Sequence, residues 1–285
     1  MDLQLINWEL VSTLVIENSI EAASKILKWE IIGIVISIAL IIIYWKRGIL
    51  KRPAHKYYNW SVKLYIPLLL IIGFIFFGKA GVIRFAHEFL TRQNQDAVNA
   101  LYDKSFGQVL GHADDPKSLI RYAEKIGQTV KTVDEGMNNL ATHVMLNSSL
   151  DSNYVENSMT ALMVQHFWKT KGRELIIAGS YYLFMMVLEK AHIPGEPEKN
   201  LTIEEFKYGI EKLKDLDAHK LEAGIKDKIG GKTQSYIDSK MHTMFYLNLL
   251  FWLLLALVPL IEYLLYKKIF EKKLMASEKL PAANQ

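Results

Sequence analysis

Cysteine is missing from the whole chain. No disulfide can form, so any domain outside the cytoplasm has to be stabilised by side-chain packing. Thiol catalysis and cysteine-ligated metals are excluded for the same reason. The sequence also has no glycine-rich phosphate loop, no Gly-x-Ser-x-Gly and no His-Glu-x-x-His. The usual signatures of nucleotide-binding proteins, serine hydrolases and zinc proteases are therefore absent.

Long apolar runs are the strongest feature that is present. They extend over Ile31 to Trp45, Leu64 to Val82 and Met244 to Tyr266. A bilayer core of about 30 Å requires roughly 17 to 25 helical residues, because lipid offers no partner to an unpaired backbone amide. The runs predict an integral membrane protein. The expected transmembrane helices are 29–45, 64–83 and 243–265.

Basic residues beside these runs predict the orientation, since Lys and Arg in short loops mark the cytoplasmic side. The loop 46–63 has no Asp or Glu, and its determinants are Lys46, Arg47, Lys51, Arg52, Lys56 and Lys63. The tail 266–285 is also rich in lysine, with Lys267, Lys268, Lys272 and Lys273 closest to the membrane. We expect both segments to be cytoplasmic.

The N-terminal segment 1–28 is short and more acidic than basic ahead of the first run, so it is expected outside the cytoplasm. Its apolar stretch is too short to cross, which predicts an interfacial amphipathic helix. By elimination, residues 84–240 face outward, which in a bacterium is the periplasm. In this segment acidic residues outnumber basic ones, whereas the rest of the chain is basic. The predicted fold is thus an all-α integral membrane protein, with a helical extracytoplasmic domain inserted between the second and third transmembrane helices.

Helical spacing of apolar residues predicts the elements of this domain. Asp115 and Pro116 are suited to start a helix. A second helix is expected over 154–169, with Gly172 placed to end it, and a third over 174–189. The apolar stretch 175–188 is shorter than a transmembrane helix, so we interpret it as a core helix rather than a re-entrant or crossing segment.

Glycine and polar residues give the remaining expectations for the domain. Thr202 and Glu205 fit a capping box at the start of a further helix. Gly230 and Gly231 are expected to break the chain before the last helix, which would then run from Thr233 straight into the third transmembrane segment. The second transmembrane helix is likewise expected to continue outward toward Leu101.

Candidate functional residues are few. Asn248 and Glu262 are polar and lie within the third apolar run, where such groups mark either an ion path or a helix–helix contact. His112, Asp114 and Asp115 form the densest group of metal-ligating side chains, although Asp residues at a helix start also serve as caps. We predict no catalytic residues and no cofactor. A metal at His112, Asp114 and Asp115 remains a weak candidate.

These features favour a non-enzymatic inner-membrane scaffold or accessory subunit of a secretion, conjugation or envelope assembly. Its expected partners are the lipid bilayer and other envelope proteins. Nucleic acid is not expected, because topology and anionic lipid explain the basic residues. Three alternatives remain: an immunity protein against a membrane or periplasmic toxin, a channel or pore subunit working as a homo-oligomer, and a metal-dependent envelope enzyme.

Overall fold

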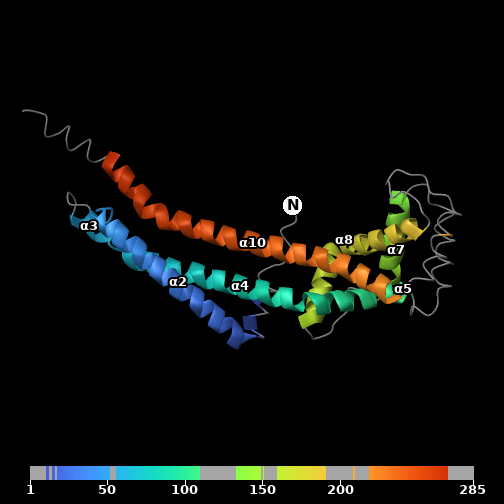
Figure 1. Ribbon diagram of the computed structural model, residues 1–285. Helices are drawn as coiled ribbons and strands as arrows, with labels where there is room; N and C mark the ends of the chain where they lie inside the picture. Colours follow the sequence, from blue (N-terminus) through green and yellow to red (C-terminus); the bar gives the residue numbers. More distant parts are fainter. Residues whose placement is uncertain are drawn as a thin grey trace, which may run out of the picture. The chain divides into compact units, whose positions relative to one another are not determined.

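The computed structural model describes residues 11–12, 15–16, 18–51, 56–109, 133–148, 150, 159–190, 208 and 218–268. All regular structure in this part of the chain is helical, and it contains no strand. The helices are α2 (Ser19–Lys46), α3 (Lys56–Val62), α4 (Tyr65–Lys104), α5 (Phe106–Val109), α7 (Val133–Asn147), α8 (Met159–Lys190) and α10 (Ala218–Tyr266), as labelled in Figure 1. The predicted all-α class is confirmed.

Three of these helices are long and apolar enough to cross a membrane: α2, α4 and α10. Their apolar side chains are also unusually exposed. Ile31, Ile71 and Phe251 are each more than half exposed, and many neighbouring side chains resemble them. Apolar surface of this extent would be unfavourable in water and is matched by lipid tails. Length, composition and exposure together indicate a membrane protein.

The described chain forms two compact units. One, here called the polar unit, runs from Glu88 to Lys240. The other, the apolar unit, holds the described residues from Val11 to His87 and from Met241 onward. Both α4 and α10 contribute residues to each unit. At 1.5 Å per residue the 49-residue α10 is about 74 Å long, well over twice the thickness of a bilayer core.

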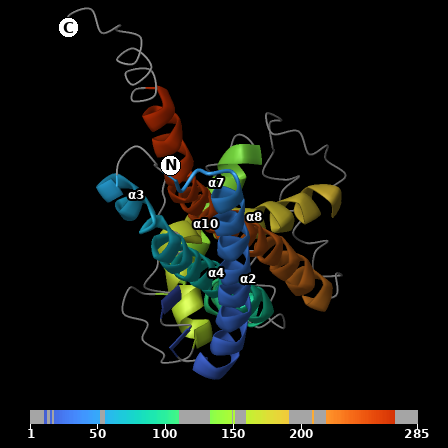
Figure 2. The ribbon, with the colours of Figure 1, turned by 90° about the vertical axis from the view of Figure 1, so that its left-hand side faces the viewer.

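Small residues bring α2 and α4 close together in the apolar unit. The two helices lie side by side in both views (Figure 1, Figure 2). A Cβ atom on Gly33 would lie 2.5 Å from the Cβ of Phe77 and 2.9 Å from the carbonyl oxygen of Gly73. A Cβ atom on Gly73 would in turn meet the side chain of Ser37. Glycine is therefore required where these backbones meet, as is common in membrane helix pairs.

An aromatic cluster joins all three long helices of the apolar unit. The Trp29 ring of α2 lies 6.4 Å from that of Phe77 on α4 and 5.5 Å from that of Phe245 on α10, between ring centroids. Trp252 packs edge-on against Phe77 at 5.2 Å. The guanidinium carbon of Arg84 lies 4.5 Å from the Phe245 centroid, a cation–π contact. Interlocked rings of this kind fix how the helices pack.

In the polar unit α7 packs against α8 (Figure 1). Leu140, Ala141 and Val144 on α7 are buried, as are Val164 and Phe167 on α8. The apolar stretch of α8 is buried too, and the fully enclosed side chains of its second half are Leu175, Ile176, Leu183, Phe184 and Leu188. These residues form a core, and α8 is not among the helices long and apolar enough to cross a membrane.

Helix continuity confirms two expectations and corrects two others. The helix of the second apolar run continues past that run as far as Lys104, and the last helix runs into the third apolar run without a break. The break predicted at Gly230 and Gly231 is wrong, because both lie inside α10. Gly172 likewise does not end a helix, since α8 passes through it.

Packing explains why these glycines do not end their helices. Glycine costs a helix about 1 kcal/mol relative to alanine, which tertiary contacts readily offset. One turn earlier in the same helix, the Trp168 ring packs against Gly172, where a Cβ would lie 3.1 Å from Trp168 Cε3. The Gly230 carbonyl accepts a hydrogen bond from the side-chain amide of Asn94 at 3.3 Å.

At the N-terminal side, α2 begins at Ser19, well before the expected start of the first transmembrane helix at 29. Residues 19–28 of the predicted interfacial segment are thus continuous with that helix. The predicted start at Asp115, the capping box of Thr202 and Glu205, and residues 154–158 of the predicted second helix all lie outside the described residues.

Candidate functional site

A hollow of about 400 Å³ opens on the surface of the polar unit between α8 and α10. We call it the α8–α10 hollow. Each helix lines it with one face, because residues three or four apart in a helix lie above one another. The lining side chains are Glu174, Ile177, Ala178 and Tyr181 from α8, and Lys228, Lys232 and Tyr236 from α10.

Close packing of the helices at one side positions these two faces. A Cβ atom on Gly179 of α8 would lie 2.7 Å from the Phe106 ring and 3.1 Å from Ile225 Cγ2 on α10. Conversely, the Tyr182 ring of α8 occupies the position where Gly224 of α10 would carry a Cβ. Glycine on each helix therefore receives a bulky side chain from the other. This contact lies beside the hollow and fixes the distance across it.

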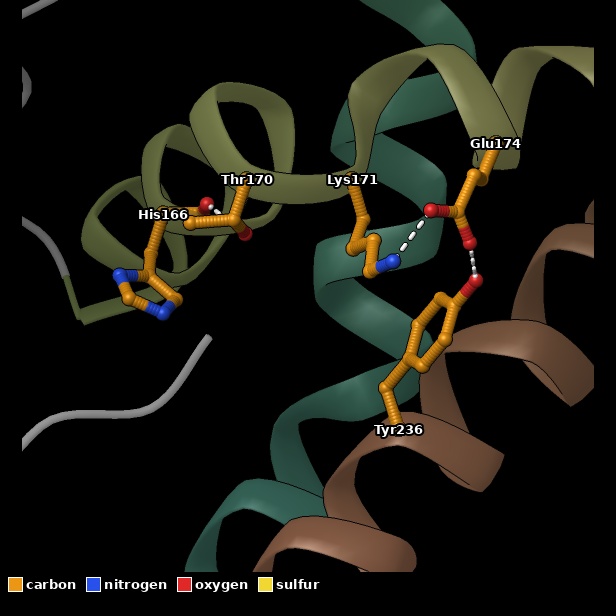
Figure 3. A network of polar contacts seen from close by, with 5 residues as sticks. All are labelled: His166, Thr170, Lys171, Glu174 and Tyr236. Carbon is orange, nitrogen blue, oxygen red and sulfur yellow. Dashed lines mark hydrogen bonds and ion pairs between the residues drawn. The ribbon is translucent and has the colours of Figure 1, made fainter. Parts of the chain in front are cut away.

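A polar network closes one end of the hollow (Figure 3). The two carboxylate oxygens of Glu174 accept hydrogen bonds from the Lys171 ammonium and the Tyr236 hydroxyl. The Lys171 Nζ atom also lies 5.3 Å from the centroid of the Tyr236 ring. Figure 3 shows the imidazole of His166 pointing away from this network. One carboxylate thus links α8 to α10.

The same network determines the charge states. The hydrogen bond from Lys171, followed by that from Tyr236, lowers the pKa of Glu174 and keeps it ionised. Burial, and then the hydrogen bond to the Glu174 carboxylate, raises the pKa of Tyr236 above its ordinary value of 10.0. At neutral pH the tyrosine is therefore a protonated donor and the carboxylate is already fully engaged. Neither group is suited to transfer a proton to a substrate.

The hollow is suited to binding. Ile177 and Ala178 supply an apolar floor, Tyr181 is about half exposed, and the ammonium groups of Lys228 and Lys232 add positive charge. Because Lys171 and Tyr236 engage Glu174, the single acidic group of the lining is already compensated. The arrangement would accept a segment with acidic and apolar side chains.

Of the predicted metal candidates, His112, Asp114 and Asp115 lie outside the described residues. In the part of the chain that is described, no three His, Asp or Glu side chains are grouped as a metal ion would require.

The polar residues of the third apolar run have helix partners. Asn248 is buried, and its side-chain amide donates to the Phe76 carbonyl of α4 at 2.7 Å. The Glu262 carboxylate accepts a hydrogen bond from the Tyr58 hydroxyl of α3. Of the two roles considered for these residues, the observed bonds are helix–helix contacts.

The basic residues predicted to set the orientation are at the surface wherever their side chains are described. Lys46, Arg47, Lys51, Lys63, Lys267 and Lys268 are all exposed. Lys56 lies in α3, whereas Arg52, Lys272 and Lys273 lie outside the described residues.

None of the residues that line the α8–α10 hollow was predicted to be functional. The sequence nevertheless contains a signal for the α8 side of the hollow. Glu174 and Tyr181 are seven residues apart, which places two polar side chains on one helical face of an otherwise apolar stretch. The contribution of α10 to the hollow depends on tertiary packing and carries no local signal. The chain matches no protein-family model, no curated protein and no solved structure.

Proposed function

We propose that the protein is a non-enzymatic adaptor of a bacterial inner membrane, whose polar unit faces the periplasm and binds other envelope proteins. The observation that carries this proposal is the α8–α10 hollow, which has an apolar floor, exposed tyrosine and lysine, and no group suited to catalysis in its lining. The proposed occupant is an acidic, partly apolar segment of a partner protein.

The orientation rests on the exposed lysines and arginine beside α2 and α10, which mark the cytoplasmic side in short loops. With these ends in the cytoplasm and three crossings, the N-terminus and the polar unit are outside. Tyrosine favours partner binding, because its large amphipathic ring gains contact area at low entropic cost. The lysines favour acidic partners and speed association with them.

The channel alternative receives no specific support from Asn248 and Glu262. Each forms a hydrogen bond to a neighbouring helix of the apolar unit, which accounts for a polar side chain at that position. Water-facing residues are what a conducting oligomer would need.

Site-specific photocrosslinking in intact cells of the native host tests the proposal. A photoreactive side chain at Tyr181 is expected to yield one crosslinked envelope protein, identified by mass spectrometry. The same group at Thr142, an exposed position of α7, is the matched control and should yield none.

Charge reversal tests whether the hollow itself makes the contact. Lys228→Glu with Lys232→Glu should lower the crosslink yield at Tyr181 about tenfold or more, since like charges across an interface cost several kcal/mol. Lys169→Glu with Lys220→Glu changes the net charge of the polar unit equally, at exposed positions outside the hollow, and should leave the yield unchanged. An equal loss in both pairs, or crosslinks only to a second copy of the chain, would contradict the proposal.

A further inference from the structure

A second hollow, of about 270 Å³, lies in the apolar unit where α2 ends. We call it the Trp45 hollow. Its lining consists of Trp45, Leu50, Lys51, Asn59 and Lys63. Its volume lies just below the range of about 300–1,000 Å³ typical of small-molecule sites. It therefore suits a headgroup rather than a larger ligand.

The turn that builds this hollow is a Schellman motif. Gly48 has φ 68°, and its N–H donates to the Trp45 carbonyl at 3.1 Å, while the Ile49 N–H donates to the Tyr44 carbonyl at 2.9 Å. Ile49 and Tyr44 are buried in one hydrophobic cluster, which is the apolar contact that usually accompanies the motif. The motif turns the chain back so that Lys51 follows the buried Leu50 on the lining.

The electrostatics of the Trp45 hollow are positive. Lys51 and Lys63 both line it, and none of its five lining residues is Asp or Glu. The end of a helix usually presents bare carbonyls that repel anions. Here the carbonyls of Ile43, Tyr44 and Trp45 accept hydrogen bonds from the amides of the turn. These three carbonyls are therefore not bare.

The position of the hollow along the helices matches that of lipid headgroups. The first apolar run ends at Trp45, and the second begins at Leu64, directly after Lys63. Tryptophan prefers this interfacial level, and lysine attracts anionic lipid there. Trp45 and Leu50 offer an apolar wall on the same hollow to which the lysines contribute charge and Asn59 an amide.

We propose that the Trp45 hollow binds the headgroup of an anionic phospholipid, with its phosphate between Lys51 and Lys63 and its glycerol backbone against Trp45. This site is independent of the α8–α10 hollow and of the partner proposed for it. Lys46, Arg47, Lys51 and Lys63 were all predicted to determine the orientation. The proposal gives Lys51 and Lys63 a second role, in lipid binding.

Native mass spectrometry of the full chain in detergent tests this assignment. Phosphatidylglycerol is the probe, and phosphatidylcholine with the same acyl chains is the reference. The unaltered protein should retain phosphatidylglycerol preferentially. Lys51→Gln with Lys63→Gln should weaken that binding about tenfold or more, because each lysine near an anionic lipid contributes about a fivefold factor.

Two controls make the outcome specific. Lys46→Gln with Arg47→Gln removes the same charge from exposed positions outside the lining and should weaken binding clearly less than the Lys51 and Lys63 pair does. Lys51→Arg with Lys63→Arg keeps the charge and should retain the lipid, which separates lost binding from misfolding. Equal losses in both Gln pairs, no preference over phosphatidylcholine, or displacement by an equal concentration of inorganic phosphate would overturn the proposal.

Discussion

The apolar stretches of α8 and α10 have similar side chains and opposite surroundings. In α8, Leu175, Ile176 and Phe184 are at most 1% exposed, whereas Leu254 and Phe251 of α10 are 52% and 57% exposed. The first stretch has one face enclosed by protein, and the second presents its side chains as a lipid-facing helix does. Apolar composition alone therefore does not tell which medium a helix occupies. Length separates the two, because the stretch in α8 is too short to cross a bilayer.

The largest expected change in the free energy of unfolding comes from replacing a phenylalanine of α8 by alanine, with the same replacement in α10 for comparison. Phe184→Ala should lower the free energy of unfolding by about 3–5 kcal/mol, because it leaves a cavity in a packed core. Phe251→Ala should cost much less, since lipid or detergent fills the space. Thermal unfolding of the full chain in detergent measures both. Equal losses would mean that Phe251 faces protein.

A smaller change in the free energy of unfolding is expected where the backbones of α2 and α4 meet. Gly33→Ala places a methyl group against Phe77 and the Gly73 carbonyl, and this overpacking should cost about 1–3 kcal/mol. Gly231→Ala in α10 adds a Cβ with no atom of the described residues within 4 Å and should be neutral or stabilising, because alanine favours the helix. Unfolding of both variants in one detergent gives the comparison. A neutral Gly33→Ala would show that α2 and α4 can separate slightly without cost.

Buried asparagines allow a closer comparison of the two units. The Asn94 amide donates to the Gly230 carbonyl, and its oxygen accepts a bond from Thr233 at 2.6 Å. Asn94→Ala should cost about 1–3 kcal/mol, since Thr233 and Gly230 lose a partner in a buried site.

Asn248 makes one comparable bond in the apolar unit, to the Phe76 carbonyl. Asn248→Ala should cost only about 0.6 kcal/mol, the average for hydrogen bonds between membrane helices. The same unfolding measurement compares the two asparagines. A larger loss for Asn248 than for Asn94 would reverse the assignment of the two environments.

The smallest expected effect is a pH dependence confined to the polar unit. Burial lowers the pKa of His166 below its ordinary value of 6.5, and its buried Nε2 atom has no hydrogen-bond partner among the described residues. Below pH 6.5 the unfolded chain therefore binds a proton more readily than the folded chain, so stability falls on acidification until the folded pKa is reached. Above pH 6.5 both states are neutral.

Melting temperatures at pH 7.5 and 5.5 measure this dependence. His166→Leu should reduce the loss on acidification, whereas His219→Leu, at an exposed position, should not. An unchanged pH dependence in His166→Leu would show that other groups cause it.

Sequence patterns predicted most of the helical architecture because long apolar runs have one physical solution in lipid. They failed at Gly172 and Gly230, where the local preference of glycine for a helix end competes with packing around it. Trp168 covers the first, and Asn94 of another helix bonds to the second. Glycine marks both helix ends and close approaches, and only the surrounding structure distinguishes them.

The candidate site was less predictable than the fold. The α8 half of the α8–α10 hollow follows a helical period, so its face can be found from the sequence. The approach of Tyr236 to Glu174 depends on how α10 packs against α8, which is fixed by Gly179 and Gly224 accepting bulky neighbours. Such pairing has no signature in either helix alone.

The aromatic cluster of Trp29, Phe77, Phe245 and Trp252 has an optical consequence. Rings held edge-on in a fixed asymmetric arrangement absorb circularly polarised near-ultraviolet light unequally, whereas freely rotating rings average that signal away. The near-ultraviolet circular dichroism spectrum should therefore report on the packing of this cluster. Each of the three long helices contributes at least one of its rings. Loss of this signal with helix content retained would reveal that α2, α4 and α10 have lost their fixed packing while each remains folded.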